Sequence, residues 1–150
     1  MRKLAMTAAA VALSIIPALA GALIVDFGSP GADAEAVASG AVAVARITSC
    51  VHPGKIVMSA TAEGVVDGKR QSIPLRLVPL KQGEKYGVMR SWPEKGSWVV
   101  KIVLTHPEYD YSPAVIVPVR KGDVDWAGVQ HFRRVPSEQD VASVLSQNGL

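Results

Sequence analysis

Cysteine, histidine and methionine are the residues of this chain with the most distinctive chemistry, and two of them stand close together. Cys50 and His52 point to the same side of an extended chain, because side chains alternate along a strand. Thiolate and thioether sulfurs suit Cu(I), so these two residues with Met58 or a third histidine would form a copper site. The competing interpretation is that Cys50 is a small residue at the edge of the core and that His52 belongs to a turn before a proline.

Catalytic chemistry has weaker support in the sequence. A thiol nucleophile at Cys50 would need His52 as a base and a third group to orient it, and the sequence offers no such group. Glu108 and Asp110 could act with His106 in acid–base chemistry only if a cleft gathered all three. The sequence contains no glycine-rich phosphate loop, serine nucleophile elbow or metalloprotease helix motif. We therefore expect a protein that is not an enzyme.

Four aromatic residues offer a different kind of site. Tyr109, Tyr111, Trp92 and Trp126 lie at or near the ends of expected strands, where the loops of a sandwich cluster and ligands are contacted. They would form a binding rim. In the alternative interpretation the tryptophans cap the ends of the core and the tyrosines flank a hairpin.

Composition narrows the function classes. The chain has 150 residues, of which 49% are hydrophobic and 19% charged, so it is too apolar to be disordered. Its net charge of +3 comes from basic residues that are interspersed with acidic ones, and no stripe of one sign indicates a nucleic-acid partner. A single cysteine excludes both an internal disulfide framework and a four-cysteine zinc site.

The N-terminus has the pattern of an export signal. Arg2 and Lys3 precede a long apolar run over residues 4–25. Small-x-small sites allow cleavage after Ala20 or after Ala34, and the second is preferred because it removes the whole apolar run. An uncleaved run would instead anchor the protein in a membrane. Both alternatives export the domain, which would be periplasmic, secreted or held on the outer face of the inner membrane.

The elements that must position these residues are mostly strands. A period of two with regular turn signals predicts strands over 41–48, 55–66, 70–80, 86–91, 97–105 and 113–120. Asp67-Gly68 is typical of a tight hairpin turn. Pro74 indicates an edge or an interruption of its strand, and the strand around Trp98 is apolar on both faces. A closing helix is expected over 138–147, with Ser137 at its N-terminal cap.

These elements predict an all-β protein with one short C-terminal helix. The expected fold is an immunoglobulin-like or transthyretin-like antiparallel β-sandwich of six to seven strands. The predicted organisation is a signal peptide or membrane anchor with a short linker over 1–34, the sandwich over 35–120, and a tail with the helix over 121–150.

A resemblance to known proteins covers about a third of the chain. The stretch 55–105, with its Asp67-Gly68 hairpin and the segment WPEKGSWVVKI over 92–102, resembles the exported YtkA-like and FixH-type domains of bacterial envelopes. The resemblance implies an extracytoplasmic β-sandwich of a kind sometimes linked to copper handling. In such domains the copper ligands are histidine and methionine residues near strand ends. No motif of this sequence matches those ligands position by position.

We therefore expect a non-catalytic exported β-sandwich module of the bacterial envelope, without a cofactor, that binds a protein or a small ligand. The alternative is a copper-binding accessory domain that uses Cys50 and His52 with Met58. The sequence indicates neither the identity of the partner nor the oligomeric state.

Overall fold

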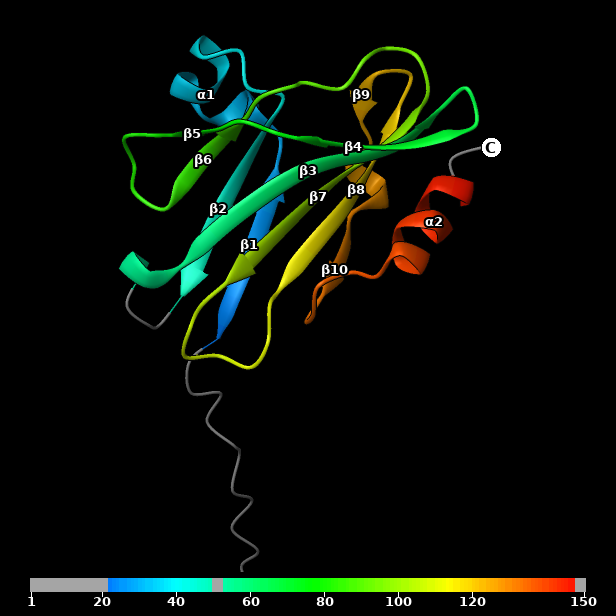
Figure 1. The fold of residues 1–150 in the computed structure, drawn as a ribbon. Helices are drawn as coiled ribbons and strands as arrows, with labels where there is room; N and C mark the ends of the chain where they lie inside the picture. The colour runs from blue at the N-terminus through cyan, green and yellow to red at the C-terminus, as the bar shows by residue number, and fades with distance from the viewer. Residues whose placement is uncertain (1–21, 50–52, 148–150) are drawn as a thin grey trace, which may run out of the picture.

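Two antiparallel β-sheets and one C-terminal helix make up the fold (Figure 1). The structure is a computed structural model and describes residues 22–49 and 53–147. The expected all-β sandwich with a short C-terminal helix is confirmed. The described residues form ten strands rather than six to seven, because several short strands escape detection in the sequence.

The smaller sheet has four strands and the larger sheet six. The smaller sheet runs in the order β1 (Leu23–Gly28), β2 (Ala43–Ser49), β6 (Lys85–Val88) and β5 (Leu77–Pro79). The larger sheet runs in the order β10 (Gln130–Phe132), β8 (Ala114–Arg120), β7 (Ser97–Thr105), β3 (Val57–Val66) and β4 (Lys69–Pro74), and β9 (Asp123–Val124) also pairs with β8. The helical segments are η1 (Pro30–Ala32), α1 (Ala34–Ala38), η2 (Pro53–Lys55), η3 (Trp126–Gly128) and α2 (Glu138–Gln147).

The segment expected as one strand over 70–80 is divided between the two sheets. β4 ends at Pro74 on the edge of the larger sheet, and β5 begins at Leu77 on the edge of the smaller one. Leu75 lies at the crossover, where its side chain is buried and its N–H donates to the carbonyl of Ala60. Pro74 has no N–H for a ladder, which explains why the strand is both interrupted and placed at an edge.

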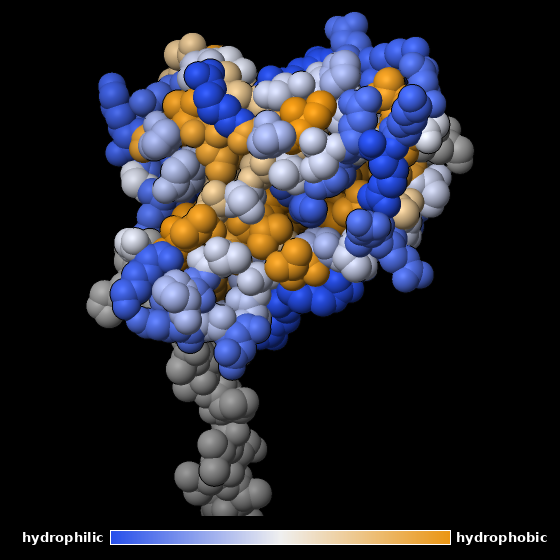
Figure 2. Space-filling model, viewed as in Figure 1, coloured by the Kyte–Doolittle hydropathy of each residue, from blue (hydrophilic) through white to orange (hydrophobic). Residues whose placement is uncertain are grey.

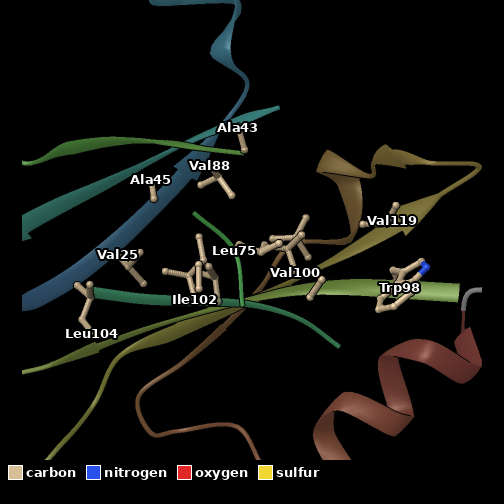
Figure 3. Packing of buried hydrophobic residues seen from close by; sticks show 14 of the residues in the cluster. Val25, Ala43, Ala45, Leu75, Val88, Trp98, Val100, Ile102, Leu104 and Val119 are labelled. Atoms are coloured by element: carbon tan, nitrogen blue, oxygen red, sulfur yellow. The ribbon is translucent and has the colours of Figure 1, made fainter. Parts of the chain in front are cut away.

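The core lies between the sheets around Trp98, whose side chain is 1% exposed (Figure 3). Val25 of the smaller sheet packs there with Ile102 and Leu104 of the larger sheet. The opposite face of β7 is also buried, since Val99 packs in a second cluster beneath α2. The prediction that this strand is buried on both faces is therefore confirmed.

Two local signals appear in the structure as predicted. Asp67 and Gly68 both adopt positive φ, at 49° and 75°, in the hairpin between β3 and β4. At the start of α2, the Ser137 hydroxyl accepts the Asp140 N–H and the Asp140 carboxylate accepts the Ser137 N–H. This reciprocal pair is a capping box with aspartate in place of glutamate. Arg134 and Ser137 both donate to that carboxylate and hold the pKa of Asp140 well below its usual value.

The fold begins upstream of the predicted boundary at residue 34. β1 pairs with β2 from Leu23 to Gly28, and the side chains of Leu23 and Val25 are each only 2% exposed. Residues 23–25, which the sequence pattern assigns to the end of a leader, thus belong to an edge strand. The segment expected as a tail after residue 120 likewise adds β9 and β10 to the larger sheet. Among the described residues, no helix is long and apolar enough to span a bilayer.

Candidate functional site

A cavity of about 440 Å³ lies where β1 of the smaller sheet approaches β10 of the larger sheet. The loop that joins β7 to β8, residues 106–113, closes one side. We call this space the edge cavity. Its lining is mostly apolar and aromatic: Ala22, Leu23, Ile24, Val25, Tyr109, Tyr111, Pro113, Ala114, His131, Phe132 and Arg133.

The inner wall of the edge cavity is apolar and belongs to the core. Leu23 and Val25 are buried in the core cluster, whereas Ile24 points outward and is 43% exposed. Figure 2 shows apolar side chains at the surface of one face of the molecule, bordered by hydrophilic ones. Ile24 is the one large exposed aliphatic residue of the described chain that lines the edge cavity.

Two tyrosines form the wall on the loop side. The rings of Tyr109 and Tyr111 meet edge to face, with centroids 5.5 Å apart. The hydroxyl of Tyr111 accepts the N–H of Leu23 at 2.9 Å and so ties the loop of one sheet to the first strand of the other. This hydrogen bond crosses 88 positions of sequence, so the wall forms only when both sheets have assembled.

His106 supports this wall from behind. It is 5% exposed, and its ring meets that of Tyr109 edge to face at 5.0 Å. Its Nδ1 accepts the N–H of Glu108, which leaves Nε2 to carry the proton in the neutral ring. Glu108 is exposed and paired with Lys55, and Asp110 is exposed. None of the three groups considered for acid–base chemistry lines the edge cavity.

Among the described residues that line the edge cavity, Arg133 carries a positive charge. The guanidinium of Arg133 lies over the ring of Tyr111, 5.8 Å from its centroid. His131 is exposed on β10 and lies opposite Val115 of β8. No aspartate or glutamate stands among the described residues of the lining. The site therefore combines an apolar interior with a cationic rim, an arrangement that suits an apolar ligand with an anionic group.

The tryptophans of the predicted binding rim lie elsewhere. Trp92 is 3% exposed in the core, and its ring lies beneath the guanidinium of Arg90. Trp126 is 39% exposed and packs on Phe27, with ring centroids 5.5 Å apart. The structure therefore brings only the two tyrosines together in one cavity.

The predicted copper ligands are described only in part. Cys50 and His52 lie outside the described residues. Met58 lies on β3 opposite Leu104 of β7, half-buried against the core. Within the residues that the structure describes, no three histidine, cysteine, aspartate or glutamate side chains are grouped as metal ligands. The copper site stays a prediction.

One further charged cluster lies on the outer face of the larger sheet, near α2. Glu63 is paired with Lys101 at 2.8 Å and accepts hydrogen bonds from Thr61 and Ser72 at 3.0 Å each. Burial raises the pKa of Glu63, but the hydrogen bond and charge of Lys101, with the two hydroxyls, outweigh it and lower the pKa below its usual value. The charge of Glu63 is thus paired and its carboxylate is hydrogen-bonded within the cluster.

Sequence reasoning missed the residues that β1 and β10 contribute to the edge cavity. Leu23, Ile24 and Val25 form an unbroken apolar stretch at the end of a longer apolar run, so no alternation marks them as a strand. β10 has only three residues and carries no clear period. Comparisons of the chain with protein-family models, curated proteins and solved structures gave no match.

Proposed function

We propose that this protein is a non-catalytic, exported binding module that holds an apolar ligand with a negative charge in the edge cavity. The observation that carries the proposal is the cavity itself, whose volume of about 440 Å³ is within the range of ligand pockets. Its walls are strands and a loop held by the hydrogen bond from Leu23 to Tyr111, so the site is largely formed before a ligand arrives.

The apolar and the charged residues of the lining would bind different parts of the ligand. The apolar wall of β1 and the two tyrosine rings would cover the body of the ligand, and burial of its apolar surface would supply most of the affinity. Arg133 would meet the anionic group at the rim. No group in this arrangement needs to exchange a proton or form a covalent bond.

Export is the second part of the proposal, with cleavage after Ala20 rather than after Ala34. Cleavage after Ala34 would remove β1, and with it the buried side chains of Leu23 and Val25 and one wall of the cavity. Cleavage after Ala20 retains the strand. The intact mass of protein exported by its own leader tests this, because a chain that begins at residue 35 would contradict it.

A fluorescence titration with 1-anilinonaphthalene-8-sulfonate, an aromatic anion, tests the binding site. Ile24→Asp places a negative charge beside the cavity at an exposed position, and Val57→Asp is the matched control on an exposed position of β3. We expect Ile24→Asp and Arg133→Gln each to weaken binding about fivefold, as one partly exposed ionic interaction of roughly 1 kcal/mol allows. Equal affinity in all these variants would contradict the site.

A further inference from the structure

We propose that the ligand of the edge cavity is an extended peptide that adds to the larger sheet as a strand beside β10. This inference rests on the proposed function and names the class of ligand. β10 ends the strand order of the larger sheet, and no described strand pairs with its outer side. An unpaired edge offers backbone donors and acceptors that an incoming strand can use.

The ladder of β8 shows which backbone groups of β10 are free. The N–H of Leu104 donates to the carbonyl of Pro113, which directs the backbone groups of the odd-numbered residues of β8 toward β7. The backbone N–H and carbonyl groups of the even-numbered residues Ala114 and Ile116 therefore point toward β10. The N–H of Asp125, which donates to the carbonyl of Pro118, agrees with this alternation.

The pairing of β8 with β10 determines which backbone groups of β10 point toward β8. Phe132 lies opposite Ala114 and Gln130 opposite Ile116, so these two residues use their backbone groups to bind β8. His131, between them, turns its N–H and carbonyl away from β8. His131 is also exposed, and no described strand pairs with this edge.

The edge cavity runs along this edge. His131 and Phe132 of β10 both line it, although neighbouring side chains of a strand point to opposite faces, and Arg133 lines it just after the strand ends. A space that contacts both His131 and Phe132 lies along the edge of the strand. A peptide placed there would pair with the backbone of His131 and face the apolar wall and the tyrosines.

Charge and polarity favour a peptide over a purely apolar ligand. An acyl chain in the edge cavity would cover the N–H and carbonyl of His131 without pairing them, which costs free energy. A peptide strand pairs them. A peptide carboxylate also matches Arg133, because no described acidic side chain lines the cavity.

The experiment uses an unlabelled hexapeptide with alternating valine and threonine and a free C-terminal carboxylate, titrated against the protein by isothermal titration calorimetry. Two further peptides carry N-methyl groups on one or the other set of alternate amides. The valines fix which face the peptide presents, and the contact of its carboxylate with Arg133 fixes its direction, so only one set of amides faces β10. We expect one N-methylated peptide to bind like the parent and the other at least about tenfold more weakly.

Protein variants test the same hydrogen bond from the other side. His131→Pro removes an N–H that β8 does not use, a change that an edge strand tolerates, whereas His131→Ala retains this N–H. We expect the proline variant to lose binding and the alanine variant to keep it. Amidation of the peptide carboxylate should weaken binding to the wild type but not to Arg133→Gln, and Arg76→Gln, an exposed arginine elsewhere, should behave as wild type.

The outcomes separate this inference from the proposed function. If both N-methylated peptides bind like the parent, strand addition is wrong and the binding site stands. The same conclusion follows if the peptide does not bind but an apolar anion does, either the fatty-acid anion dodecanoate or the naphthalene sulfonate. If the protein instead pairs with itself through β10 and excludes the peptide, the inference is again overturned. If no probe binds, both proposals fail.

Discussion

Removal of β1 gives the sharpest prediction about stability. If β1 is part of the fold, its removal lowers the free energy of unfolding, whereas the removal of a leader would not. We compare a chain that begins at residue 21 with one that begins at residue 35. Leu23 and Val25 are each 2% exposed, and complete burial of such side chains contributes about 1.5 to 3 kcal/mol each. The shorter chain should therefore lose roughly 3 to 6 kcal/mol, a large part of the 5 to 15 kcal/mol typical of a folded domain.

Urea unfolding followed by tryptophan fluorescence measures this difference, since Trp98 lies in the core that β1 covers. Point variants of the longer chain provide the controls. Leu23→Ala should cost about 2 to 5 kcal/mol, and Ile24→Ala, which truncates the exposed neighbour, should cost less than about 0.5 kcal/mol. Equal unfolding midpoints for the two chain lengths would refute the assignment of β1 to the fold.

The remaining predictions concern the larger sheet. A Cβ at Gly64 would lie 2.4 Å from the ring of Trp98, so Gly64→Ala should cost about 1 to 3 kcal/mol in urea unfolding, whereas Gly28→Ala, with open space around it, should not show this penalty. Trp98→Ala should cost about 3 to 5 kcal/mol by the same assay, and a smaller loss than about 1 kcal/mol would contradict its central place. Glu63→Gln should lower the free energy of unfolding at pH 7, and the deficit should vanish as the pH falls below 4.5 through the lowered native pKa of Glu63; a deficit independent of pH would contradict the ion pair.

Elements with strong local signals were predictable from the sequence. β7 and α2 have the expected bounds, because a long β-prone run defines the strand and a capping residue with helical spacing defines the helix. The hairpin at Asp67-Gly68 depends on positive φ at two adjacent residues, which these residue types supply locally.

Elements that depend on distant partners were not predictable. β1 and β10 owe their strand conformation to pairing with β2 and β8, and nothing in their own short sequences distinguishes them from a leader and a loop. At Pro74 the sequence predicted that the strand is interrupted. It did not predict that the chain passes from the larger sheet to the smaller one there.

The same distinction applies to the candidate site. Tyr109 and Tyr111 were identified as rim residues because loops at strand ends carry binding contacts. Their counterparts on β1 and β10 lie about twenty to ninety positions away, and only the assembled sheets bring them to the same cavity.

The central claim is that the edge cavity binds the ligand. An NMR titration of the ¹⁵N-labelled protein with the valine–threonine hexapeptide tests it most directly. We predict that the amide shifts that change on binding cluster in residues 22–25, 109–112, 114 and 131–133, with His131 among the largest. Shifts confined to another face of the sandwich, or no shifts at millimolar peptide, would contradict it.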